Sequence, residues 1–232
     1  MELWLFLLRW IHFLAGITWI GLLYYFNFVQ TPFFAEAEPG VRSAAIQKLV
    51  PRALWWFRWG AMATFLTGLL LYIHYMIQSG AGGFYSTAYA WAITLGGTLG
   101  TIMFLNVWLV IWPNQKVVIA SATQAAQGGQ AIPEAANCGR RAALASRTNV
   151  VFSIPMLFYM GARHLPGFGE ATSGSITGLV VIGGLIIAAV EANALFGLQG
   201  STKKPLDTVT GALWSGFILA AILYLLFAVL FR

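Results

Sequence analysis

The chain has 232 residues, of which 59% are hydrophobic and 9% are charged, and its mean hydropathy is +0.76. This composition excludes a soluble globular protein, because too few polar residues remain to cover its surface. The formal net charge of +6 comes from short basic loops between apolar segments, so it requires no nucleic-acid partner.

Six apolar stretches approach the length of about 20 residues that a helix needs to cross a bilayer. They predict an all-α, polytopic membrane helical bundle that forms a single transmembrane domain over residues 1–232. The fourth stretch is the weakest, because it is short and contains Pro155, which removes a backbone hydrogen-bond donor. The predicted spans cover residues 3–29, 53–77, 88–112, 149–162, 174–197 and 209–231.

Charge alternates between the loops. The loops that follow the first, third and fifth spans are basic, whereas residues 79–87, after the second span, carry no charge. Because short cytoplasmic loops retain Lys and Arg, both termini are predicted to lie in the periplasm of a bacterial inner membrane. Residues 113–148, between the third and fourth spans, are expected to be a surface connector with a short amphipathic helix near 140–146.

The three histidines of the chain are His12, His74 and His164. In the predicted topology all three lie towards the periplasmic side, with the small residues Gly60 and Ala63 on the face of the second span that carries His74. Two imidazoles on adjacent helices are a common way to hold a b-type haem. His12 and His74 are therefore predicted to bind haem b through its iron, with His164 as an alternative ligand or proton carrier. The competing interpretation is that each histidine only hydrogen-bonds a neighbouring helix.

A second group of polar residues lies in the predicted inner half of the membrane. Arg58 and Glu191 have opposite charges at similar depth, and a charge in the bilayer core is expected to have a partner. The pair would either fix the register of two helices or form part of a proton path or substrate anchor. Asn27, Asn106 and Asn193 could extend either arrangement.

Cys138 is the only cysteine, so this sequence contains neither an internal disulfide nor a Cys-x-x-Cys-His site for covalent haem. Any redox centre within these residues would need other ligands.

Four segments together resemble the membrane domain of the bacterial urate hydroxylase family, also called the urate oxidase N-terminal domain. They are WIHFLAGITWIGLLYYFNFVQ at 10–30, WPNQ at 112–115, ASRTN at 145–149 and SIPMLF at 153–158. The resemblance implies a multi-helix membrane domain, commonly followed by a cytochrome c domain, that oxidises urate and passes electrons to the respiratory chain. Because these residues lack a cytochrome motif, the resemblance implies a separate cytochrome c as acceptor.

Two functions remain open at this point. The first is a redox protein with haem b on His12 and His74, electrons leaving to a periplasmic cytochrome c, and Arg9 or Arg163 beside a urate anion. The second is a non-catalytic accessory subunit of a larger respiratory or photosynthetic complex, in which the histidines form only structural hydrogen bonds.

Overall fold

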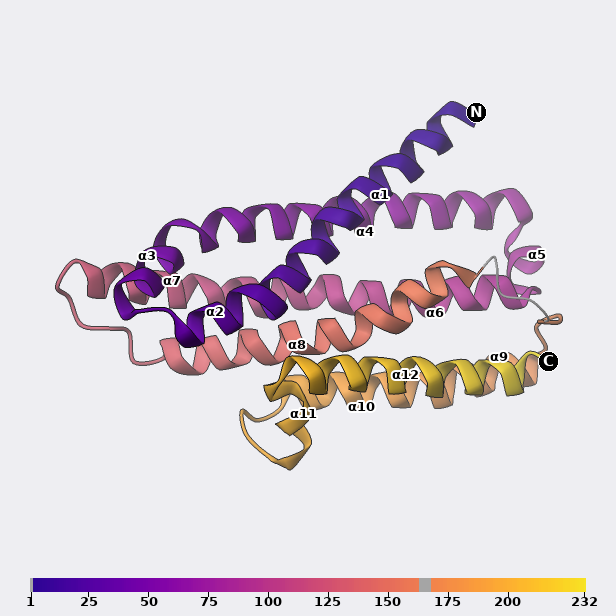
Figure 1. Cartoon of the computed structure of the whole chain (residues 1–232). Helices are drawn as coiled ribbons and strands as arrows, with labels where there is room; N and C mark the ends of the chain where they lie inside the picture. The colour runs from indigo at the N-terminus through magenta and orange to yellow at the C-terminus, as the bar shows by residue number, and fades with distance from the viewer. Residues whose placement is uncertain (1, 163–167) are drawn as a thin grey trace.

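The computed structural model describes residues 2–162 and 168–232, which fold into helices joined by short connections (Figure 1). Three of the helical elements, η1, η2 and η4, are π-helical turns, and η5 is a 3₁₀ turn. In chain order the elements are α1 (Glu2–Tyr24), η1 (Tyr25–Gln30), α2 (Thr31–Glu36), α3 (Pro39–Lys48), α4 (Val50–Ser79), α5 (Ala81–Tyr85), α6 (Ala88–Leu105), η2 (Asn106–Ile111), α7 (Trp112–Ala126), α8 (Ala135–Met160), α9 (Ser173–Gly178), η4 (Leu179–Gly183), α10 (Gly184–Leu195), η5 (Ser201–Lys203), α11 (Lys204–Asp207) and α12 (Val209–Leu230).

Five continuous helical runs in the described residues are long and apolar enough to cross a membrane, as expected for a polytopic membrane bundle. They cover Leu3–Glu36, Val50–Ser79, Ala88–Ala126, Ser173–Leu195 and Val209–Leu230. These runs correspond to five of the six predicted spans. The predicted fourth span falls in the C-terminal half of α8, which is long enough but more polar than the others.

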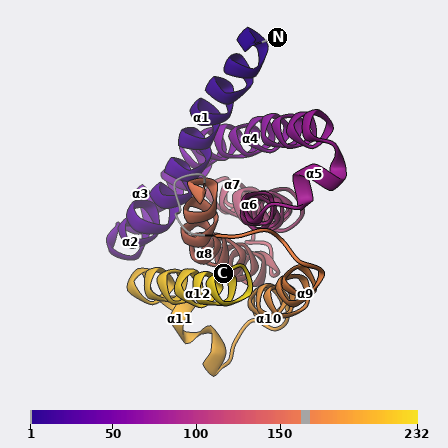
Figure 2. The ribbon, with the colours of Figure 1, turned by 90° about the vertical axis from the view of Figure 1, so that its right-hand side faces the viewer.

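The polarity of α8 follows from its central position. Figure 2 shows α8 in the middle of the bundle, and it contacts α1, α6, α10 and α12. Protein side chains, rather than lipid, therefore surround most of this helix, and polar residues can find partners there. Its sequence places four polar residues at positions that are at most 6% exposed, namely Arg147, Thr148, Asn149 and Ser153.

The prediction of a surface connector at 113–148 is wrong. Helix α7 continues α6 through η2, α8 begins at Ala135, and only residues 127–134 join the two helices. The run Ala88–Ala126 contains 39 residues, or about 58 Å at 1.5 Å per residue, so it extends well beyond a hydrocarbon layer of about 30 Å. The Ala- and Gln-rich composition that suggested a connector also favours a helix, and α3 packs against α7.

Two of the π-helical turns end two residues before a proline. Pro32 follows η1, which ends at Gln30, and Pro113 follows η2, which ends at Ile111. A proline inside a helix lacks the N–H group and clashes with the carbonyl four residues earlier, and a wider turn is one way to accommodate it. Side chains help to satisfy nearby carbonyls, since Thr31 Oγ1 donates to Phe26 O and Asn114 Nδ2 donates to Val110 O.

The two termini lie at the same end of the bundle (Figure 1). The opposite end carries α3, the turn between α7 and α8, and α11. The basic residues of the predicted cytoplasmic loops belong to these elements or to the neighbouring helix ends, namely Arg42, Lys48, Arg52, Lys116, Arg140, Arg141, Lys203 and Lys204. Termini at one end agree with an even number of membrane crossings, which the five apolar runs and α8 together would make. Which end faces the cytoplasm stays a prediction.

Candidate functional site

A hydrogen-bonded group of two buried amides and one half-buried carboxylate joins three helical segments of the bundle. Asn106 Nδ2, at the start of η2, donates to Asn149 Oδ1 on α8 at 3.0 Å and to Glu191 Oε2 on α10 at 3.1 Å. Asn149 Nδ2 donates in turn to Met103 O at 3.0 Å. We call Asn106, Asn149 and Glu191 the amide–carboxylate cluster. It places one carboxylate, held by an amide donor, inside the apolar bundle.

Other polar residues of α8 bond to the first helical run. Asn27 in η1 donates from Nδ2 to Ser146 Oγ at 2.8 Å, and the hydroxyls of Tyr24 and Ser153 lie 2.9 Å apart. Asn27 is buried and also donates to Leu23 O in its own helix. Polar side chains of α8 therefore tie it to two other helical runs, α1–η1 and α6–η2, through bonds that are well suited to an environment without water.

A groove of about 420 Å³ lies between α6 and α10 beside the amide–carboxylate cluster. Its wall contains Glu191 and Thr98 among small and aliphatic residues such as Gly184 and Ala188. Because only one oxygen of the Glu191 carboxylate bonds to Asn106, the other can exchange a proton or hydrogen-bond a ligand in this groove.

A second cavity, of about 280 Å³, lies between α8, α10, α12 and the connection from α10 to α12. Four of its lining residues are polar and come from four different segments, and the others are apolar. The polar four are Thr148, Asn193, Thr202 and Ser215. We call this space the α8–α12 cavity.

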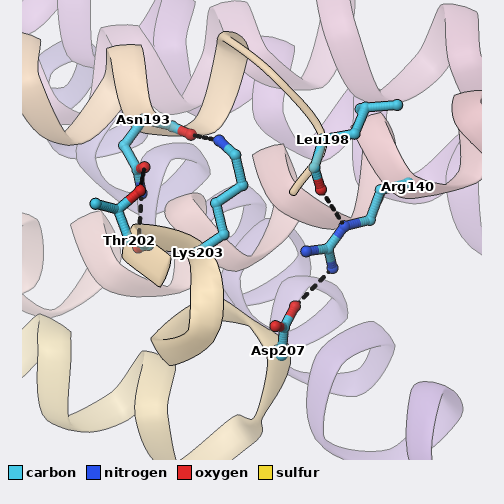
Figure 3. Close-up of polar contacts among 6 residues, drawn as sticks. All are labelled: Arg140, Asn193, Leu198, Thr202, Lys203 and Asp207. Carbon is cyan, nitrogen blue, oxygen red and sulfur yellow. Dashed lines mark hydrogen bonds and ion pairs between the residues drawn. The ribbon is translucent and has the colours of Figure 1, made fainter. Parts of the chain in front are cut away.

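The connection after α10 is fixed by buried and half-buried cations (Figure 3). Lys203 Nζ donates to the backbone oxygens of Asn193 and Phe196 at the C-terminal end of α10, where the helix dipole favours a positive charge. Arg140 donates from Nε to Leu198 O at 3.0 Å and pairs with Asp207 through Nη1 at 2.7 Å. These contacts hold the floor of the α8–α12 cavity in place.

Three buried polar groups on α8 have no protein partner in the described structure. They are Nη1 of Arg147, a residue that is 6% exposed, Oγ1 of Thr148, which is fully buried, and the hydroxyl of Tyr159 near the end of the helix. Buried donors are almost always hydrogen-bonded in folded proteins, so two adjacent exceptions mark this part of α8 as a candidate binding region.

The structure places His12 and His74 on neighbouring helices but at different levels. His12 Nδ1 lies 2.9 Å from Thr64 O and 3.1 Å from Thr67 Oγ1 on α4. His74 stacks edge-on against Trp4, with ring centroids 6.2 Å apart. Trp4 precedes His12 by eight residues, about 12 Å along the helix, so the two imidazoles do not face each other across a common site.

The space that a haem would need between α1 and α4 is filled by α1 itself. A Cβ atom added at Gly60 would lie 3.3 Å from Trp19 N, and one at Gly68 would lie 2.9 Å from His12 Cε1. The small residues of α4 therefore allow close packing of two helices. As they stand, His12 and His74 do not fit a haem iron shared between them, although Nε2 of His74 is buried without a partner.

The remaining predicted residues have separate positions. His164 and Arg163 lie outside the described residues. The Arg9 guanidinium lies over the ring of Tyr75, with its carbon 5.6 Å from the ring centroid, and Asn27 binds Ser146 as described above.

The predicted pairing of Arg58 with Glu191 is wrong. The Arg58 guanidinium carbon lies 3.5 Å from the ring centroid of Trp112 and 5.5 Å from that of Trp108, while Glu191 binds Asn106. Similar predicted depth did not bring the two charges together, because both side chains contact the run α6–η2–α7, which lies between α4 and α10. A cation–π contact satisfies Arg58 instead.

Sequence reasoning gave no site role to Asn149 or Thr148. The available signal was the run Arg147-Thr148-Asn149, three polar residues at the edge of an apolar stretch. The partners of Asn149 could not be read from the sequence, because they lie on another helical run.

The fold and the buried polar groups define a multi-pass membrane protein with an intramembrane polar site. The chain belongs to the urate oxidase N-terminal family, whose model matches residues 81–228. No curated protein sequence matches the chain, and no solved structure does. The matched residues include the amide–carboxylate cluster and most of the helices that line both cavities, whereas His12 and His74 precede them.

Proposed function

We propose that the protein is the membrane component of a urate-oxidising redox system in the bacterial inner membrane, with a separate periplasmic cytochrome c as electron acceptor. The family name supports the substrate, and the helices support the membrane location. The observation that carries the proposal is the amide–carboxylate cluster, which lies within the family-matched residues and contains a half-buried carboxylate in the wall of the groove between α6 and α10.

The chemistry of urate oxidation gives this cluster a role. Urate and water yield a hydroxylated product, two protons and two electrons, so a base must accept a proton and two molecules of a one-electron cytochrome c must accept the electrons. Glu191 is the candidate base, and Asn106 Nδ2 orients its carboxylate from 3.1 Å. A positioned general base typically contributes about 10²–10⁴-fold to a rate.

Glu191→Gln is therefore expected to lower urate oxidation by at least about 100-fold in membranes supplied with cytochrome c. The measurement is the loss of urate absorbance together with reduction of the cytochrome. Glu134→Gln, at an exposed position in the turn before α8, is the control and should retain full activity.

Two outcomes would contradict the proposal. Full activity in Glu191→Gln would remove the carboxylate from the reaction, and an absence of urate loss with every acceptor tested would remove the activity itself. Binding of haem b stays a prediction for this chain, and a reduced-minus-oxidised spectrum of the same preparation tests it.

The accessory-subunit function is favoured by one observation. The N-terminal part of α1 packs against α4 and lies at the edge of the bundle in both views (Figures 1 and 2). Leu3, Phe13 and Ile17 on this part are 68–71% exposed, a surface that a partner helix in a larger complex could cover as readily as lipid. Loss of a co-purifying complex on truncation of α1, without any urate activity in the intact protein, would support this second function.

A further inference from the structure

We propose that the protein binds an anionic phospholipid at a surface formed by α4, η2 and the start of α7. The headgroup phosphate bonds to Arg58 and Lys116, and three tryptophans lie around the two cations. We call Arg58, Lys116, Trp59, Trp108 and Trp112 the cation–tryptophan patch. The patch contains no residue of the amide–carboxylate cluster, and the inference does not depend on the substrate.

Both cations of the patch lie against one aromatic ring. The Arg58 guanidinium carbon is 3.5 Å from the ring centroid of Trp112, and Lys116 Nζ is 5.6 Å from the same centroid. The two charges belong to different helices, α4 and α7, which contact each other. Because they share one ring, the two positive charges act at the same place on the surface, as two contacts to one lipid headgroup require.

Arg58 keeps hydrogen-bond donors available for a ligand. Its Nε donates to Leu54 O at 3.2 Å, and stacking on Trp112 occupies a face of the planar guanidinium rather than its N–H edge. Nη1 and Nη2 make no hydrogen bond to the described residues, and neither is among the buried polar atoms left without a partner. Both therefore remain accessible on a half-buried residue, and two such N–H groups match two oxygens of a phosphate.

No carboxylate neutralises the patch within residues 2–162 and 168–232. The ion pair found there joins Arg140 to Asp207, and Glu191 bonds to Asn106. A cation in or beside the apolar layer is expected to have a partner of opposite charge, and an aromatic ring carries no net charge. An anionic lipid supplies the missing negative charge.

The patch lies at the level where lipid phosphates are expected. Trp112 ends the apolar part of the Ala88–Ala126 run, and the sequence Pro-Asn-Gln-Lys follows at 113–116. Arg58 lies about two turns inside α4, which begins at Val50, and the long side chain of an arginine can reach from there towards the headgroups. Lys116 is exposed.

The tryptophans favour a lipid over a free phosphate ion. Trp55, Trp56 and Trp59 are 47–60% exposed on α4, and Trp59 stacks edge-on against Trp108, with ring centroids 5.6 Å apart. Tryptophan is enriched where hydrocarbon meets headgroups. A phospholipid offers a phosphate to the cations and hydrocarbon chains to these rings at the same time, whereas an ion offers only the first.

The end of the bundle also agrees with an anionic lipid. Helix α3, which packs against α7 and carries Arg42 and Lys48, lies at the end that holds the basic connections (Figure 1). That end is the predicted cytoplasmic end, and the cytoplasmic leaflet is the one whose anionic lipids attract basic segments.

Native mass spectrometry of the purified full-length protein, titrated with phosphatidylglycerol in detergent, tests the site. Phosphatidylglycerol is expected to bind at least about fivefold more tightly than phosphatidylcholine with the same acyl chains, because the choline cancels the phosphate charge. Arg58→Gln and Lys116→Gln are each expected to weaken phosphatidylglycerol binding about fivefold, the usual contribution of one Lys or Arg near an anionic membrane.

Two matched controls remove a cation elsewhere. Lys204→Gln removes an exposed lysine of α11 at the same end of the bundle, and Arg232→Gln removes an exposed arginine at the opposite end. Both should bind phosphatidylglycerol as the wild type does. Because Lys116 is exposed, Lys116→Gln should keep the wild-type thermal unfolding midpoint, so it tests the site even if Arg58→Gln is less stable.

Equal affinity of the wild type for the two lipids, or wild-type phosphatidylglycerol affinity in both Arg58→Gln and Lys116→Gln, would overturn the proposal. An equal loss of affinity in Lys204→Gln would also overturn it, since the loss would then be a general effect of charge. Inorganic phosphate at millimolar concentration should leave the lipid bound. Displacement of the lipid by phosphate would identify the ligand as a free anion and contradict a lipid site.

Discussion

Individual polar residues in this bundle are satisfied by partners on other helices, and the kind of partner differs from residue to residue. Arg58 lies on an aromatic ring, Asn27 bonds to a serine, and Asn106 bridges an amide and a carboxylate. Such interhelical bonds replace part of the hydrophobic driving force that is missing between helices in lipid.

At the residue scale, Asn149→Ala is expected to lower the stability of the bundle. The change removes the acceptor for Asn106 and leaves Met103 O without its side-chain donor. Leaving buried polar groups unpaired costs about 1–3 kcal/mol, which should appear as a lower apparent thermal midpoint in detergent, followed by circular dichroism. Asn137→Ala, at an exposed position on the same helix, should leave the midpoint unchanged, and an equal effect of the two changes would contradict the role of the cluster.

At the scale of the elements, the contact between α8 and α12 depends on a glycine. A Cβ atom at Gly216 would lie 2.5 Å from Ile154 Cδ1 and 3.0 Å from Val151 O. The isoleucine methyl could move, but the backbone oxygen of α8 cannot move without shifting the helix. The closeness of the two helices is thus set at this position.

Gly216→Ala is therefore expected to destabilise the protein by about 1–3 kcal/mol, the usual effect of overpacking. Gly97→Ala on α6 is the matched control, because a Cβ atom there meets nothing within 4 Å. Thermal unfolding of the two variants in the same detergent makes the comparison. A Gly216→Ala protein as stable as Gly97→Ala would show that α12 can move away from α8 at little cost.

At the scale of the whole molecule, the arrangement of the helices places both termini at one end and the basic connections at the other. The distribution of Lys and Arg then predicts the orientation in the membrane, since cytoplasmic loops retain positive charge. The proposed exit of electrons to a periplasmic cytochrome c depends on this orientation.

An alkaline phosphatase reporter, which is active only in the periplasm, tests the orientation. It is expected to be active when fused after Arg232 and inactive when inserted in the turn at 127–134. The reverse pattern would place both termini in the cytoplasm and contradict the orientation predicted from Lys and Arg.

The family and the membrane class were predictable from local features of the sequence. Apolar run lengths are dictated by the thickness of the bilayer, so five of the six predicted spans correspond to apolar helices in the structure. The four quoted segments already indicated the urate oxidase N-terminal family, and the family model confirms it over residues 81–228. The extent of α8 was underestimated, because a helix surrounded by protein does not need the uniform apolarity that a hydropathy pattern detects.

The sequence by itself determined that this is a helical membrane protein, where most of its spans lie, and which of its ends is basic. Only the tertiary structure decided that Arg58 meets Trp112, that Glu191 meets Asn106, and that Thr148 lines a cavity without a partner. The physical reason is that hydrophobicity along the chain fixes the depth of a residue in the bilayer. Its partners depend on how each helix is rotated and packed against its neighbours. That rotation and packing are determined jointly by side chains from several segments that are distant in the sequence.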